Sequence, residues 1–256
     1  MPLSYQQITP LLARQVKLLM TDVDGTLTSA DDTIDTPVHD VIRELENSGI
    51  MVGLVSGRTL PGLELLARRL NISGPLIAEN GAVARLSKDA VRMDLGYSRQ
   101  PALDSLEKLK TLFPHSIRER EDNAERLVDV VLWADDVPRE TLMQHLEGVQ
   151  LIDSGYIMHL MVAGINKGAT LLQILDKIGQ DGISPQDVLV FGDSATDLSL
   201  FELLPNSVLI PNPRLAPELV KDVNKAARYV AGIPYGEGFV QVAEHIIKAR
   251  NSSVNG

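Results

Sequence analysis

One stretch organises this sequence: Val16-Lys17-Leu18-Leu19-Met20-Thr21-Asp22-Val23-Asp24-Gly25-Thr26. A short apolar run that ends in Asp and Gly is typical of a buried strand opening into a loop. Because alternate side chains of an extended chain share a face, Asp22 and Asp24 are expected side by side. Two close carboxylates are costly unless a cation or a proton lies between them. The stretch therefore predicts a site that binds a divalent metal and directs one carboxylate at a substrate, with a simple acidic turn as the alternative.

Two more apolar runs end in polar residues. The run 50–55 leads into Ser56-Gly57-Arg58, and the run 75–78 leads into Glu79-Asn80-Gly81. Amphipathic helical patterns separate these runs, the first of them opened by Thr36 as its N-cap. Strands that alternate with such helices predict a Rossmann-like parallel sheet with helices on both faces. Ligands bind such sheets beyond the carboxyl ends of the strands, so the three polar ends are expected at one edge.

The pattern changes after Gly81 and returns near Ile165. The region between them mixes helices with short, antiparallel-looking strands, and we interpret it as an inserted α+β cap domain. The predicted division is a catalytic core of residues 1–82 and 161–256 and a cap of residues 83–160. Within the cap we expect two short strands over 83–95, helices over 101–113 and 138–146, a hairpin over 117–133, and strands over 149–152 and 156–161.

The α/β rhythm resumes in the last third of the chain. A strand over 187–191 leads into Gly192-Asp193-Ser194-Ala195-Thr196-Asp197, and a strand over 207–210 is followed by Asn212. The last helix is expected over 238–248, and residues 251–256 are expected to be disordered.

Composition excludes several classes of protein. The 24 basic and 34 acidic side chains give a formal charge of −10, which argues against a general nucleic-acid or anionic-membrane surface. No cysteine is present, so disulfides, thiolate catalysis and zinc–cysteine sites are excluded. The first residues do not resemble a signal peptide, and no apolar run approaches the roughly 20 residues that span a bilayer. We expect a cytoplasmic protein, monomeric or homodimeric, without a nucleic-acid partner.

Four stretches in order resemble the motifs of one family, the haloacid dehalogenase superfamily of phosphohydrolases. They are Asp22-Val23-Asp24-Gly25-Thr26, Ser56 with Gly57-Arg58, Lys167 in Asn166-Lys167-Gly168, and Gly192 to Asp197. The insert between the second and third motifs is similar to that of the branch with a large α/β cap. That branch includes phosphatases of sucrose phosphate, trehalose phosphate, mannosyl-3-phosphoglycerate and phosphoglycolate, and also phosphomannomutase. In its fourth motif the branch usually has Asn where this chain has Thr196.

The resemblance assigns roles to the charged residues. Mg²⁺ is the expected cofactor, because it is a hard ion that prefers oxygen ligands. Asp22 would bind the metal and attack phosphorus, and Asp24 would act as general acid and base and also bind the metal. Asp193 and Asp197 complete the expected metal site, with capping of the following helix as the alternative for Asp197. Lys167 would balance charge on the transferring phosphoryl group.

A further set is expected to bind the phosphate or the rest of the substrate: Ser56, Gly57, Thr26, Asn212, Asn80 and Arg120. For several of these a plainer role is open: helix capping for Ser56, turn formation for the two asparagines. Arg118 and Arg120 can grip a second anionic group or belong to a solvated charged tip. Arg58 is expected to form a structural ion pair, and Met158 and His159 to pack in the cap.

The predicted function is Mg²⁺-dependent hydrolysis of a phosphomonoester through an aspartyl-phosphate. The substrate is expected to be a sugar phosphate or a phosphorylated sugar acid, such as sucrose phosphate or mannosyl- or glucosyl-3-phosphoglycerate. Phosphoglycolate hydrolysis and phosphosugar mutation are the alternatives that use the same site. A non-enzymatic phospho-acceptor domain is the alternative from another class, but it would need neither a cap nor an acid at Asp24.

Overall fold

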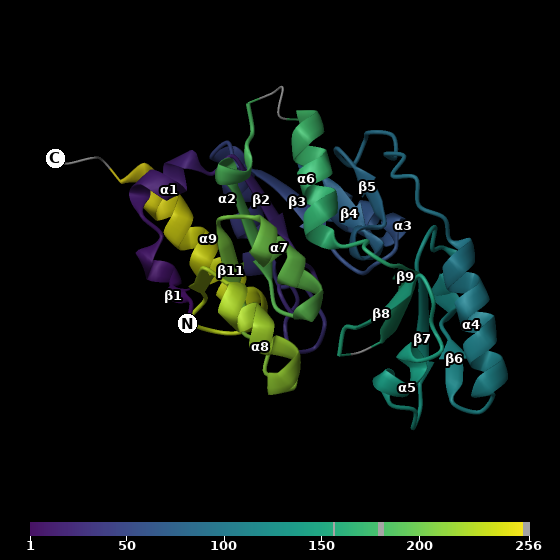
Figure 1. Ribbon diagram of the computed structural model, residues 1–256. Coiled ribbons are helices and arrows are strands. Elements are labelled where there is room, and N and C mark those ends of the chain that lie inside the picture. Colours follow the sequence, from purple (N-terminus) through teal and green to yellow (C-terminus); the bar gives the residue numbers. More distant parts are fainter. Residues whose placement is uncertain (156, 179–181, 253–256) are drawn as a thin grey trace.

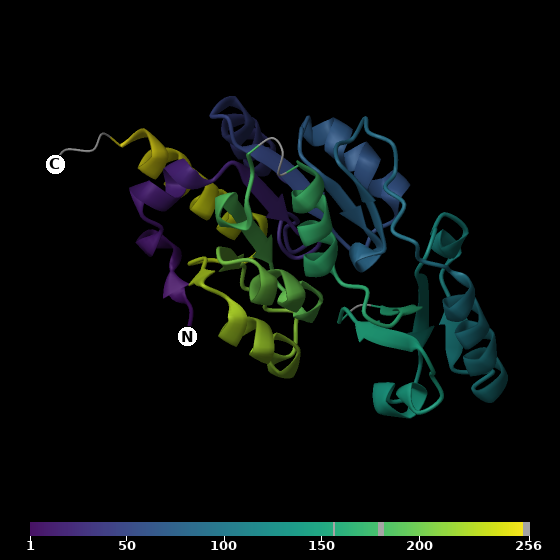
Figure 2. The same cartoon turned by 45° about the horizontal axis from the view of Figure 1, so that its top comes forward.

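The computed structural model describes residues 1–155, 157–178 and 182–252. Two sheets organise these residues: an eight-stranded sheet and a separate four-stranded antiparallel sheet. Figure 1 shows the second sheet and its helices as a group beside the larger one, and Figure 2 shows the same two groups from another direction. The predicted α/β core with an inserted α+β unit is confirmed.

The large sheet is parallel except at one edge. Its strands run in the order β1-β12-β11-β10-β2-β3-β4-β5, and only the β4–β5 pair is antiparallel. Their bounds are β1 Leu3–Ser4, β2 Leu18–Thr21, β3 Met51–Val55, β4 Leu76–Ala78, β5 Val83–Arg85, β10 Val188–Gly192, β11 Ser207–Leu209 and β12 Tyr229–Val230.

Helices cover both faces of this sheet. One face packs against α1 Pro10–Gln15, α2 Thr36–Asn47, α3 Leu60–Leu70 and α9 Tyr235–Asn251. The other face packs against α6 Lys167–Ile178, α7 Leu198–Leu203 and α8 Pro217–Ala226. In both views α1 and α9, from opposite ends of the chain, lie side by side.

The central strand β2 shows why the sequence folds in this way. Leu19 points into one apolar cluster, whereas Leu18 and Met20 point into the other, and all three are fully buried. A strand that is apolar on both faces is stable only between two helical layers. Because β2 lies between β10 and β3, the residues that follow it are placed at the middle of the sheet edge.

The smaller unit has its own apolar core. Helix α4 Gln100–Leu112 packs on the sheet, whose strand order is β6-β7-β9-β8. The bounds are β6 Ile117–Glu119, β7 Val130–Ala134, α5 Arg139–Met143, β8 Val149–Asp153 and β9 Met158–Val162. The predicted start of the last strand at Tyr156 lies outside the described residues.

Three local predictions were wrong. Asp35, not Thr36, is the N-cap of α2, and Thr36 is its first helical residue. Val83–Arg85 was expected in the cap, but it pairs with β4 in the large sheet, and its only further partner among the described residues is an isolated bridge to Arg92. The last helix begins before residue 238, since Gly236 and Gly238 fit close approaches to the carbonyls of Leu27 and Ile233 rather than breaking the helix.

Two other expectations are settled only in part. The predicted disorder of residues 251–256 falls mostly outside the described residues, and Asn251 itself closes α9. Among the helices of the described segments, none combines the length and apolar character needed to cross a bilayer.

A buried carboxylate joins the large sheet to the cap. Glu79 follows β4, is fully buried, and accepts the backbone N–H groups of Leu127, Val128 and Asp129 at 2.9, 2.8 and 2.9 Å. Burial and the nearby Asp129 raise the pKa of Glu79, while the three N–H donors favour its charged form. The cap segment 127–129 is therefore held by a side chain of the core.

Replacing Glu79 by Gln should destabilise the protein, because the amide group places N–H against backbone N–H. The expected loss is about 2–3 kcal/mol of unfolding free energy, measured by urea denaturation at neutral pH. The matched control is Asp135→Asn, which weakens an exposed ion pair with Arg118 and should cost less than about 1 kcal/mol. Equal losses in the two variants would contradict a stabilising contact between Glu79 and the backbone of residues 127–129.

Candidate active site

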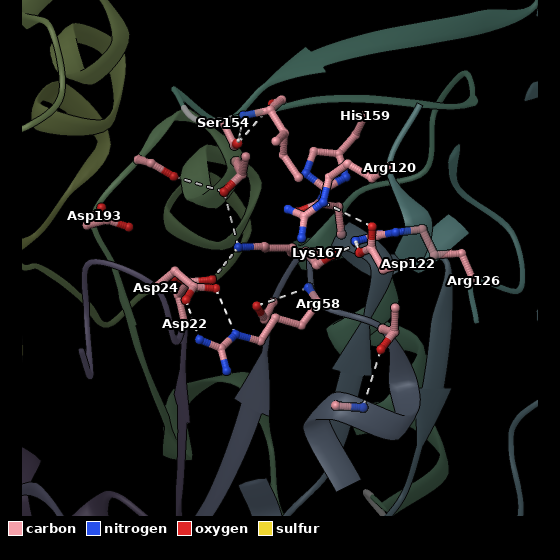
Figure 3. Close-up of a pocket in the computed structure, with 18 of the residues that line it drawn as sticks. Asp22, Asp24, Arg58, Arg120, Asp122, Arg126, Ser154, His159, Lys167 and Asp193 are labelled. Atoms are coloured by element: carbon pink, nitrogen blue, oxygen red, sulfur yellow. Dashed lines mark hydrogen bonds and ion pairs between the residues drawn. The ribbon is translucent and has the colours of Figure 1, made fainter. Parts of the chain in front are cut away.

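The carboxyl ends of β2, β3, β4 and β10 open into a cavity of about 490 Å³ that the cap covers from the other side. Figure 3 shows the charged side chains converging there. The lining contains most of the residues that the sequence singled out, namely Asp22, Asp24, Ser56, Gly57, Asn80, Arg120, Lys167 and Asp193. The described lining does not include Thr26, Asp197 or Asn212.

A buried ammonium group lies at the base of the cavity. Lys167 begins α6 with its side chain only 1% exposed, and its Nζ lies 2.7 Å from Asp22 Oδ1 and 2.7 Å from Asp197 Oδ1. Burial alone would lower the pKa of Lys167, but Asp197 and Asp22 raise it above its usual value. The lysine is therefore charged, and it offsets part of the negative charge around it.

Three carboxylates form a candidate metal site. Ligand oxygens of Asp22, Asp193 and Asp197 lie within 4.8 Å of one another, and all three residues are buried. Asp193 Oδ1 has no hydrogen-bond partner among the described residues, which is unusual for a buried carboxylate oxygen. The oxygen donors suit a hard divalent cation such as Mg²⁺, and the open oxygen of Asp193 gives it a place to bind.

The two carboxylates after β10 have different surroundings. Asp197 uses Oδ1 for Lys167 and Oδ2 for the backbone N–H groups of Asp193 and Ser194, at 3.0 and 3.1 Å. These contacts fit a residue that shapes the loop and holds Lys167. Asp193 keeps an oxygen open, so Asp22 and Asp193 are the better metal ligands of the three.

Proton binding and metal binding compete at this cluster. Burial raises the pKa of Asp22 well above its usual value, opposed by Lys167. Burial and Asp197 raise the pKa of Asp193 to about 7. A bound cation would favour the ionised form of both groups.

The second carboxylate of the organising stretch is paired. Arg58 donates from Nε and Nη2 to the two oxygens of Asp24, at 2.9 and 2.5 Å. Both side chains are partly exposed to the cavity, 36% for Arg58 and 45% for Asp24. The expected ion pair of Arg58 is thus present, and its partner is the residue expected to exchange protons with substrate.

The loop after β3 lies against the loop after β4. Gly57 passes so close to Asn80 and His159 that a Cβ atom there would lie 3.1 Å from Asn80 Nδ2 and 3.1 Å from His159 Cε1. Asn80 takes a left-handed conformation with φ of 54°, and its buried Nδ2 has no partner within the described chain. Ser56 is buried at the cavity wall and its Oγ accepts the N–H of Arg58. Ser56 and Asn80 are therefore placed to contact a bound anion.

Two residues expected at the phosphate are not part of the described cavity lining. Thr26 is fully buried and its N–H bonds to the carbonyl of Val23, because the chain turns tightly after Asp24. Asn212 directs Nδ2 to Asp193 Oδ2 at 2.5 Å, so it orients a carboxylate of the candidate metal site. At the position that departs from the family pattern, the hydroxyl of Thr196 lies 3.1 Å from Lys167 Nζ.

The cap contributes a charged cluster that the sequence reasoning missed. Asp129 is fully buried between Arg126 Nη1 at 2.6 Å and His159 Nδ1 at 2.7 Å. Burial opposes ionisation of Asp129, but His159 and Arg126 outweigh it and lower its pKa. Arg126 also donates to the carbonyl of Gly57 at 3.0 Å, which ties the cap to the loop after β3. The one signal in the sequence was an Asp within the apolar run 128–132.

Comparison with known proteins identifies the family of the chain. The model of the haloacid dehalogenase-like hydrolases matches residues 19–127 and 135–233. The chain belongs to this family. A curated relative from Methanospirillum hungatei, named phosphoglycolate phosphatase, is 32% identical over 88% of this chain and 94% of its own length. A second with the same name, from Thermoplasma volcanium, is 31% identical over 90% of this chain and 98% of its own.

Solved structures agree with the fold. A Thermoplasma acidophilum protein, 0175, superposes with a TM-score of 0.75 and 26% identity, covering 90% of this chain and 98% of its own. A haloacid dehalogenase-like hydrolase from Bacteroides thetaiotaomicron gives a TM-score of 0.70 at 20% identity, over 91% and 99% of the two chains, which supports the fold alone. The resemblance read from the four motifs is confirmed, as is the prediction of an enzyme with phosphatase chemistry.

Replacing Asp22 by Asn should lower turnover by roughly a thousandfold or more while leaving the fold intact, since the two side chains have similar volume. Phosphate release and circular dichroism check the two halves of this prediction. Asp40→Asn, which changes an exposed residue of α2, is the matched control and should keep full activity. Residual activity above a few per cent in the Asp22 variant would exclude it as the nucleophile.

The pKa shifts of Asp22 and Asp193 predict how stability depends on pH. Without metal, the folded protein holds protons that the unfolded chain has released, so its unfolding free energy should fall as pH rises from about 4 to about 7. Mg²⁺ replaces those protons, so the gain in melting temperature from Mg²⁺ over EDTA should be larger at pH 8 than at pH 5.5. A larger gain at pH 5.5 would contradict this account of the cluster.

Proposed function

We propose that this protein is a Mg²⁺-dependent phosphomonoester hydrolase that acts on a small phosphorylated metabolite. The arrangement of Asp22 supports this best: its carboxylate is buried, held by Lys167, and adjacent to the open oxygen of Asp193. Asp22, Asp193 and the backbone of Asp24 would hold the ion, which would neutralise charge on the phosphoryl oxygens.

The residues divide the reaction into two steps. A carboxylate oxygen of Asp22 attacks phosphorus, and the bond to the ester oxygen breaks as Asp24 gives that oxygen a proton. Asp24 then takes a proton from the water that attacks the aspartyl-phosphate, which releases inorganic phosphate and restores Asp22. Lys167, Ser56 and Asn80 surround the phosphoryl oxygens and stabilise their charge. Arg58 orients Asp24, and one of its two hydrogen bonds has to open for each proton transfer.

We place phosphoglycolate first among the substrates, ahead of the sugar phosphates and sugar acids that the sequence favoured. The relatives of nearly equal length support this order, since both are named for that activity. A mutase would use the same residues, but no contact in the cavity favours it. A cytoplasmic location and a monomeric or homodimeric state stay predictions from the sequence.

The test is phosphate release by the purified protein with Mg²⁺ and with EDTA, across phosphoglycolate, sucrose phosphate, trehalose phosphate, mannosyl- and glucosyl-phosphoglycerate and hexose phosphates. We expect Mg²⁺-dependent release that is fastest with phosphoglycolate. The Asp22→Asn variant, purified in the same way, controls for contaminating phosphatases. Absence of release from every ester by the folded protein would overturn the proposed function, and a sugar phosphate as best substrate would overturn the order.

A further inference from the structure

The described lining of the cavity contains four Arg and Lys side chains, and three of them direct at least one hydrogen bond from a terminal nitrogen to a carboxylate. Arg58 uses two nitrogens on Asp24, and Lys167 lies between Asp22 and Asp197. Arg126, with its side chain 3% exposed, is divided between two carboxylates and the Gly57 carbonyl. Each of these three has a terminal nitrogen that is already bonded to a carboxylate of the protein.

Arg120 differs from them. Its Nε forms an ion pair with Asp122 Oδ1 at 3.0 Å, and its guanidinium lies 5.5 Å from the ring centre of Trp133. Its terminal amino groups make no hydrogen bond to any residue within the described ranges. Figure 3 shows the side chain reaching from the cap side of the cavity toward Lys167, with His159 beside it. Arg120 therefore brings unengaged donors to the end of the cavity opposite the nucleophile.

Contacts with neighbouring cap residues set the position of Arg120. The second oxygen of Asp122 accepts from Arg126 Nη2 at 2.9 Å, and Arg126 in turn holds the Gly57 carbonyl at 3.0 Å. Asp122 and Trp133 thus hold the guanidinium in place, and Arg126 links Asp122 to the loop after β3. A fork held in this way loses little freedom when it binds a planar anion.

The charges in the cavity indicate what Arg120 binds. Asp24, Asp32 and Asp122 line the same space, and each is already paired with an arginine, so a carboxylate on the substrate needs a cation that still has donors to offer. An arginine fork matches the two oxygens of a carboxylate. We propose that Arg120 binds the carboxylate of a phosphorylated acid and selects such substrates over neutral phosphate esters. The inference rests on the proposed function, and it assigns the discrimination to one cap residue.

Arg118 provides a matched comparison two residues earlier. It also lies over Trp133, at 5.1 Å, but its nitrogens bond to both oxygens of Asp135 at 2.7 and 3.1 Å. Its side chain is 59% exposed, and the described lining of the cavity does not include it. Removing its charge therefore changes the same cap hairpin without changing the cavity.

The experiment compares phosphoglycolate with 2-hydroxyethyl phosphate, in which CH₂OH replaces the carboxylate. The full chain with Mg²⁺ is assayed as unmodified protein and as Arg120→Met, Arg120→Lys and Arg118→Met. We expect the preference, the ratio of the two kcat/KM values, to fall roughly 10- to 100-fold in Arg120→Met, mainly through KM for phosphoglycolate. Arg120→Lys should recover part of the preference, and Arg118→Met should keep all of it.

The outcomes separate the two proposals. An unchanged ratio in Arg120→Met, an equal fall in Arg118→Met, or an unmodified protein without preference for the acid would overturn the role of Arg120 and leave the phosphatase standing. Arg120 would then belong to a solvated charged tip. Absence of Mg²⁺-dependent release from either ester by the unmodified protein would overturn the phosphatase proposal and the role of Arg120 with it.

Discussion

The ammonium group of Lys167 is the constraint on which the site depends. Three carboxylates lie within 4.8 Å of one another in a buried place, and such a cluster is costly without positive charge inside it. Lys167 supplies that charge from α6, between Asp22 after β2 and Asp197 after β10. One buried cation thus brings together three elements that lie far apart in the chain. It also leaves Asp193 with an open oxygen, which is what a divalent ion needs.

A second set of polar contacts connects the core side of the cavity to the cap side. Glu79 holds the backbone of residues 127–129, and Arg126 holds the carbonyl of Gly57. Both contacts are buried or partly buried, where hydrogen bonds to charged groups are strong. The cap residues that line the cavity are therefore positioned against the loop after β3.

Much of the fold and part of the site were predictable, because the patterns that indicate them extend over only a few neighbouring residues. Leu18, Leu19 and Met20 indicated a strand buried on both faces, and the polar residues after each strand predicted a common edge. The residues that the sequence misplaced follow from contacts it does not encode locally. Thr26 turned inward because its N–H closes a turn, and Asn212 turned to Asp193 because that carboxylate lies beside it. The buried joint of Glu79 with residues 127–129 spans a domain boundary, so no local pattern pointed to it.

The sequence by itself determined the alternation of strands and helices, the order of the four motifs, and the identity of the groups that meet at the sheet edge. These are consequences of side-chain periodicity and of chain direction, which act over a few residues. Only the tertiary structure decided which charges are balanced. Arg58, Arg120 and Arg126 are the same residue type in the sequence. In the structure Arg58 is bound to Asp24, Arg126 is buried among carboxylates, and the terminal amino groups of Arg120 make no hydrogen bond within the described chain. Electrostatic pairing depends on distance and burial in space, and those are set only when the cap and the sheet come together.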